Sequence, residues 1–125
     1  MNTKIEYLYR SGANYKWAGE VILPGVPVCR MATYEAALRG TCETDDHFIA
    51  SQVGLPSCFP WETGHAAYED DEDHCYHEFA SAVATDESPT LDIEPSAMLA
   101  RFQSAHKEGW EAFDPAETNT PSMRI

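Results

Sequence analysis

Two stretches near the start of the chain, whose residues alternate in polarity, constrain the fold most. In residues 4–10, KIEYLYR, Ile5, Tyr7 and Tyr9 alternate with positions that include the charged Glu6 and Arg10, which is the period of a strand with one buried face. Residues 17–23, WAGEVIL, form a second strand candidate. The SGAN segment between them contains Gly12 and Asn14, which tolerate the backbone angles of a turn. The sequence therefore predicts an antiparallel hairpin.

Helical spacing follows the hairpin and returns near the end of the chain. Apolar residues recur at helical intervals over residues 27–39, and Gly40 supplies a C-terminal stop. Pro95 suits the first turn of a second helix, which Gly109 would end. The apolar face of that helix would consist of Met98, Leu99, Phe102 and Ala105.

Residues 47–53 and 75–83 read as two further strands. The order strand–strand–helix–strand–strand–helix predicts an α+β fold with a small antiparallel sheet of about four strands and two helices on one face. We expect one domain over residues 1–113, with an acidic loop at 56–73 and a flexible tail at 114–125.

The charge of the chain is strongly uneven. The chain has 21 acidic and 8 basic residues, a net charge of -13. Residues 1–39 contain five basic and three acidic residues, a net of +2, whereas residues 40–100 contain fourteen carboxylates and no lysine or arginine. Such a chain repels nucleic acid phosphates and anionic membranes, and it favours basic protein partners or simple solubility.

The expected compartment is the cytoplasm. The first ten residues lack the pattern of a signal peptide, and no segment approaches the ~20 apolar residues of a membrane helix. The four cysteines form no C-x-x-C pair, so we expect them to stay reduced rather than to build a disulfide framework.

The run EDDED at residues 69–73 is the strongest functional clue. As an extended chain it would place one charge about every 3.4 Å, which is ~3.4 Å per phosphate of a DNA strand. We predict a non-enzymatic binding module, of the kind carried by phages and plasmids, that presents a DNA-like anionic face to a basic nucleic-acid-binding protein and inhibits or modulates it. An acidic loop without a partner is an open alternative. The expected contact residues are Glu69, Asp70, Asp71, Glu72, Asp73, Asp45 and Asp46.

The adjoining segment DHCYHEF raises a metal-site alternative. Asp73, His74, Cys75 and His77 are all ligand types, and Cys58 or His65 would complete a zinc site from the preceding loop. Alternation along a strand weakens this reading, because it places His74 on the face opposite to Cys75 and His77. The ligand spacing of a typical structural zinc site is also missing. The alternative function is therefore a metal-binding domain or metal-dependent enzyme, and no catalytic residue is predicted.

Three separated motifs resemble a family of small uncharacterised bacterial proteins. The motifs are the YLYR and NYK segments of residues 7–16, VGLP at 53–56, and DHCYHEF at 73–79, where the family often has tryptophan in place of Tyr76. The resemblance spans roughly residues 4 to 105 and is specific, because the motifs agree in order. It implies a shared fold, and it assigns no activity and no site residue.

Overall fold

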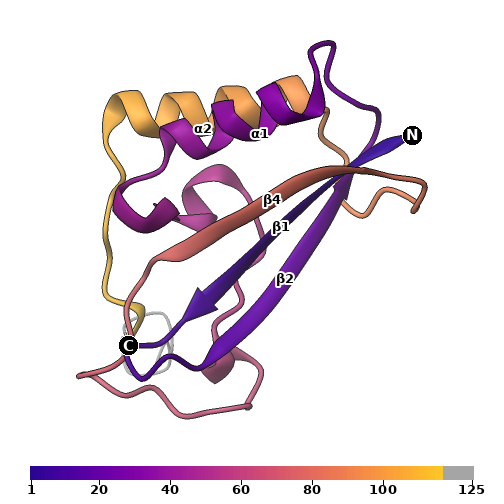
Figure 1. Ribbon diagram of the computed structural model, residues 1–125. Helices are drawn as coiled ribbons and strands as arrows, with labels where there is room; N and C mark the ends of the chain where they lie inside the picture. Colours follow the sequence, from indigo (N-terminus) through magenta and orange to yellow (C-terminus); the bar gives the residue numbers. More distant parts are fainter. Residues whose placement is uncertain (117–125) are drawn as a thin grey trace.

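The computed structural model describes residues 1–116 of the chain. It confirms the α+β fold class and the predicted order of strands and helices (Figure 1). Three short 3₁₀ helices lie in the connections. The elements are β1 (Asn2–Arg10), β2 (Lys16–Leu23), α1 (Met31–Thr41), η1 (Thr44–Asp46), β3 (His47–Phe48), η2 (Ala50–Val53), η3 (Pro60–Glu62), β4 (His77–Thr85) and α2 (Pro95–Glu108).

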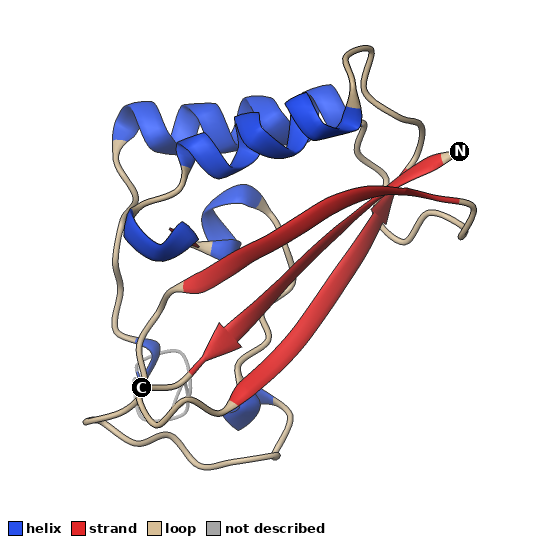
Figure 2. Cartoon of the chain, viewed as in Figure 1, coloured by secondary structure: helices blue, strands red, loops and turns tan. Residues whose placement is uncertain are grey.

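The four strands form one antiparallel sheet in the order β2-β1-β4-β3. Strand β1 lies in the middle and pairs with both long neighbours, so that Tyr7 is opposite Gly19 on one side and Phe79 on the other. A register shift between Glu6 and Tyr7 marks a β-bulge in the pairing with β4. The short β3 closes one edge of the sheet, and β2 forms the other. The long strands β2, β1 and β4 lie side by side (Figure 2).

Both helices cover one face of the sheet and lie side by side (Figure 1). The alternation seen in the sequence is the cause, because the odd-numbered residues Thr3–Tyr9 are buried while their neighbours are half-exposed. Helix α1 contributes Tyr34 and Leu38 to the core, and α2 contributes Met98 and Phe102. Burial of side chains of this size stabilises a fold by about 1.5–3 kcal/mol each.

Several predicted boundaries were wrong. The strand expected over 47–53 stops at Phe48, because residues 50–53 coil into η2 and Gly54 ends that turn with a left-handed φ of 78°. Helix α1 begins at Met31 rather than at position 27, since residues 24–30 form an irregular loop in which Val28 is exposed. Strand β4 runs over His77–Thr85, two residues later than predicted.

The structure describes only the first three residues, 114–116, of the tail predicted over 114–125. Residues 117–125 of that tail lie outside the described residues, whereas Pro115 is buried. In the part of the chain that is described, no helix is both long and apolar enough to cross a membrane.

Candidate functional site

The acidic run is a folded turn rather than an extended segment. The backbone N–H groups of Glu72 and Asp73 both donate to the carbonyl of Glu69, over 3.1 and 2.9 Å. Residues 70–72 are accordingly in a turn conformation. We call residues 69–73 the acidic turn. The expected charge spacing of an extended strand is therefore wrong, because the backbone of residues 69–73 folds back on itself.

The acidic turn is held firmly against the hairpin. The N–H of Gly12 donates to the carbonyl of Glu72 over 2.7 Å, and the Tyr9 hydroxyl donates to Oδ1 of Asp73 over 2.6 Å. The other oxygen of Asp73 accepts the N–H of Glu69 over 2.8 Å. Position 12 is tight for a side chain, because a Cβ there would lie 3.1 Å from the carbonyl oxygen of Glu72 and the turn would have to shift slightly.

Most of the predicted contact residues lack an internal cation. Within residues 1–116, no ion pair or side-chain hydrogen bond involves the carboxylates of the first four residues of the turn or of Asp45. Two predicted residues differ: Asp46 pairs with Arg39 over 2.6 Å, and Asp73 is used to hold the turn. The acidic surface is therefore built from Glu69, Asp70, Asp71, Glu72 and Asp45.

An open cleft of about 420 Å³ lies beside this surface. Gly12, which touches Glu72, forms one side of it, and Asp45 forms another. Arg10 is the cation of the cleft, and its Nε atom lies 2.6 Å from the carboxylate of Glu78. That hydrogen bond raises the pKa of Arg10. The cleft is lined by Arg10, Ser11, Gly12, Asp45, His47, His74 and Glu78.

Two histidines line the cleft in different states. His74 accepts the N–H of Tyr76 at Nδ1, over 3.0 Å, and its Nε2 lies 2.7 Å from the carbonyl oxygen of Arg10, to which it therefore donates. His47 stacks on Tyr76 with ring centroids 5.5 Å apart, and its side chain forms no hydrogen bond within residues 1–116. His47 is thus the free imidazole of the cleft.

His77 faces the interior, as strand alternation predicts. Its Nε2 atom accepts the N–H of Cys58 over 2.8 Å, and the ring of Phe59 lies 4.8 Å away between centroids. Burial, with a smaller effect from His74, lowers the pKa of His77 to about 4. The ring is therefore neutral at pH 7 and has a structural role.

The structure does not bring the predicted metal ligands together. No group of three or more His, Cys, Asp or Glu side chains among residues 1–116 is arranged to hold a metal ion. Both ring nitrogens of His74 and both oxygens of Asp73 already have protein partners. Burial raises the pKa of the Cys75 thiol, so the thiolate that zinc prefers is disfavoured there. The pKa of Cys58, raised by burial to about 11, points the same way.

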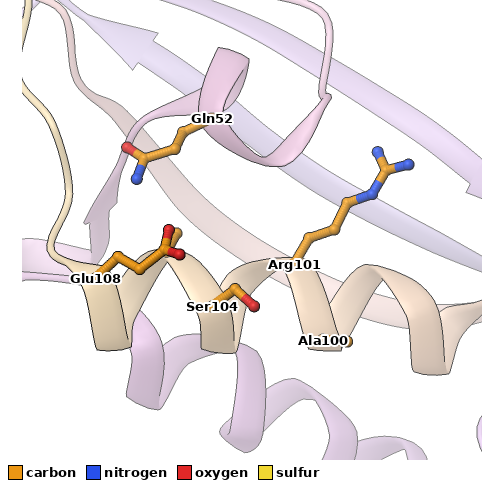
Figure 3. A pocket seen from close by; sticks show the side chains of 6 residues that line it. Gln52, Ala100, Arg101, Ser104 and Glu108 are labelled. Carbon is orange, nitrogen blue, oxygen red and sulfur yellow. The ribbon is translucent and has the colours of Figure 1, made fainter.

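A second hollow, of about 260 Å³, lies between α2 and η2 (Figure 3). Its polar side chains serve the fold. The amide of Gln52 donates to the Gly109 carbonyl and accepts the N–H of Glu111, while Arg101 donates to the carbonyl of Val53. These bonds tie the end of α2 to η2 and leave no convergent set of free groups in this hollow.

Of the residues that line the cleft, the sequence analysis named Asp45 as a contact residue and His74 as a metal ligand, and it did not assign Arg10, His47 or Glu78 to a site. Arg10 and Glu78 lie far apart in the chain and meet because β1 pairs with β4 and places Leu8 opposite Glu78. The alternation of β1 does predict that Arg10 and the even-numbered residues share a face. Glu78 and His47 join that face because β4 pairs with both β1 and β3, and no local sequence pattern predicts these pairings.

Comparison with known proteins identified no similar protein. No family model, no curated protein and no solved structure matches the chain, so the family resemblance drawn from the three motifs remains a prediction.

Proposed function

We propose that this protein is a non-enzymatic binding module whose acidic turn and adjoining cleft receive a basic protein. One observation carries the proposal: within residues 1–116 the carboxylates of Glu69–Glu72 and Asp45 form no ion pair, and Asp45 lines an open cleft whose Gly12 wall contacts Glu72. The backbone of the acidic turn is already held in place by its bonds to Tyr9 and Gly12, so a basic partner gains the attraction of these charges without the entropic cost of ordering the loop.

The cleft suits a lysine or arginine side chain. Its walls offer carboxylate oxygens at Asp45 and Glu78 and a free imidazole at His47. A partner cation entering the cleft competes with Arg10 for Glu78, while the acidic turn draws the rest of a basic surface to the rim. Complementary potentials of this kind raise association rates and select partners by charge.

In the finer form of the proposal, the partner is a nucleic-acid-binding protein that the module inhibits or modulates in the manner of a phage- or plasmid-borne factor. The support is chemical, because a surface that binds phosphates also binds clustered carboxylates. The location proposed is the cytoplasm, where the four cysteines, all free in this structure, remain reduced.

Capture of a defined class of proteins tests both levels of the proposal. The immobilised protein is offered the heparin-binding fraction of a bacterial lysate, which is rich in basic nucleic-acid-binding proteins, at about 50 mM and about 300 mM salt. A variant with Glu69→Gln, Asp70→Asn and Asp71→Asn, the acidic-turn triple, is compared with a control triple of Asp86→Asn, Asp92→Asn and Glu111→Gln. Both triples change the same residue types and remove the same charge from exposed positions.

The proposal predicts that the wild type and the control triple retain the same proteins at low salt, and that the acidic-turn triple loses them. Added double-stranded DNA should displace the retained proteins if they bind nucleic acid through the same surface. Equal retention by the two triples would contradict the proposed site. Retention that DNA does not disturb would leave the basic partner in place but refute the nucleic-acid-binding form.

A further inference from the structure

The outer edge of β2 has backbone groups that bond to no other group within residues 1–116. Ile22 directs its N–H and carbonyl outward, where they bond to Thr90 and Leu91. Because alternate residues of a strand direct these groups to the same side, Lys16, Ala18 and Glu20 also present theirs outward. The carbonyl of Tyr15 points toward β1, where it accepts the N–H of Ser11. This agrees with the alternation, in which odd-numbered residues bond toward β1 and even-numbered residues point outward.

No other segment within residues 1–116 bonds to these outward groups, and β2 is terminal in the sheet. The edge is also exposed, since the side chains of Lys16, Ala18 and Glu20 all face solvent. Exposed edges of this kind accept a further strand unless charge or geometry prevents it. Here the arrangement of charges decides which strand fits.

The edge is complementary to itself. In an antiparallel pair centred on Ala18, Lys16 lies opposite Glu20 of the second copy, and Glu20 lies opposite Lys16 of the second copy. Cross-strand pairs of opposite charge are stabilising, and the small Ala18 side chains allow close approach at the centre. Each of the three residues then exchanges both backbone hydrogen bonds with its counterpart.

A hollow of about 280 Å³ adjoins the same edge, on the face that points toward the core. Its walls include Gly19 of β2 and residues Pro56–Phe59 of the following loop. The chain's own Trp17 also lines this hollow and stacks on Tyr9 with ring centroids 6.1 Å apart, so the hollow is already partly filled within each copy. Position 19 is confined to glycine, because a Cβ there would meet the sulfur of Cys58 at 2.6 Å.

We propose that two copies of this chain associate through antiparallel pairing of their β2 edges about Ala18. The paired segment belongs to residues 1–39, which carry a net charge of +2 by five basic and three acidic residues. The association therefore uses the third of the chain that has no net negative charge. It does not depend on the proposed function.

Sedimentation equilibrium of the full chain, over about 5–500 µM protein at about 150 mM salt, measures the association. The wild type should reach a dimer within this range. Lys16→Glu places a carboxylate opposite Glu20 of the other copy in both pairs, so we expect the dissociation constant to rise about tenfold or more. The double variant Lys16→Glu with Glu20→Lys restores opposite charges and should recover most of the affinity.

Ala18→Pro removes an outward N–H and places a ring at the centre of the edge. Proline is tolerated on an edge strand where its nitrogen faces solvent, so this variant should fold and remain monomeric. Hydrogen exchange supplies an independent readout, because the amides of Lys16, Ala18 and Glu20 should gain protection as wild-type concentration rises.

A wild type that stays monomeric throughout, with these amides exchanging freely, would overturn the proposal and leave the edge to a strand of another protein. A dimer that is unaffected by Lys16→Glu would overturn it as well, because association would then use another face. The charge-swapped double variant keeps the test decisive even if Ala18→Pro does not fold.

Discussion

The Nε2 atom of His77 accepts a hydrogen bond from the backbone N–H of Cys58 over 2.8 Å, and this bond joins β4 to the loop that precedes η3. The neutral ring must therefore carry its proton on Nδ1, which is buried and has no hydrogen-bond partner within residues 1–116. Protonation of Nε2 would break the bond and bury a charge among the rings of Tyr7, Tyr9, Phe48 and Phe59.

The first prediction is a pH dependence of stability that His77 causes. The pKa of His77 is about 4 in the folded protein, against 6.5 for an ordinary histidine, so the unfolded chain binds the proton more readily. The free energy of unfolding should be highest above pH 6.5 and fall by roughly 3 kcal/mol toward pH 4 from this group alone. Urea unfolding at a series of pH values measures the slope.

His77→Gln should flatten that slope between pH 6.5 and 4, whereas His106→Gln should leave it unchanged, because His106 is exposed on α2. Equal slopes for the wild type and His77→Gln would show that the histidine does not contribute.

A second prediction concerns the contact between Gly12 and Glu72. A methyl group at position 12 would approach the carbonyl oxygen of Glu72 to 3.1 Å, so Gly12→Ala must displace the acidic turn or strain the hydrogen bond between them. We expect a loss of about 1 kcal/mol in the free energy of unfolding. Gly40→Ala is the control, since position 40 lies in α1 and has open space around it.

The two alanine substitutions should have opposite signs in thermal or urea unfolding. Gly40→Ala should stabilise the protein by about 0.5–1 kcal/mol, because alanine restricts the unfolded chain and favours the helix. Stabilisation by Gly12→Ala would contradict the tight contact with the acidic turn.

The Tyr9 hydroxyl provides a third prediction, because it both donates to Asp73 and accepts the N–H of His74. Tyr9→Phe removes both bonds and should lower the free energy of unfolding by about 1–3 kcal/mol. Tyr34→Phe removes one bond, to the carbonyl of Pro95, and should cost less. Tyr9→Phe should also weaken binding of a basic peptide severalfold without any change in charge, since the turn is then held less firmly.

If Tyr9→Phe and Tyr34→Phe bind that peptide equally, the fixed position of the acidic turn is irrelevant to recognition. Calorimetric titration at equal ionic strength makes this comparison.

The ion pair between Arg10 and Glu78 provides a fourth prediction, in which the two partners should change the affinity for a basic peptide in opposite directions. Arg10→Gln removes the cation of the cleft and should tighten binding of a lysine- and arginine-rich peptide about two- to fivefold, whereas Glu78→Gln should weaken it by a similar factor. The difference should shrink as salt rises. Changes in the same direction for both variants would rule out an electrostatic role for the cleft.

The fold could largely be read from periodicity, for identifiable reasons. The alternation of Ile5, Tyr7 and Tyr9 marks a strand with one buried face, and Pro95 and Gly109 bracket α2 as predicted. The failures lie where tertiary contacts override local pattern. Residues 50–53 were expected to continue a strand, yet Gly54 and the hydrogen bond from Leu55 to Ala50 coil them into η2.

The candidate site was only half predictable. The acidic composition of residues 69–73 is visible in the sequence, but their turn depends on Tyr9 and Gly12, which are distant in the chain. The strand pairing that places Glu78 near Arg10 is likewise a nonlocal result. Composition therefore predicted the charge of the surface, and the fold determined its shape.

The most direct test of the central claim is the affinity of the charge-matched triples for one basic ligand. Fluorescence anisotropy of a labelled lysine- and arginine-rich peptide, at about 50 mM salt, gives a dissociation constant for each variant. The account predicts that the acidic-turn triple binds about tenfold more weakly than the control triple, although both have the same net charge. Equal dissociation constants would show that only total charge matters, and would contradict the assignment of the acidic turn and its cleft as the binding site.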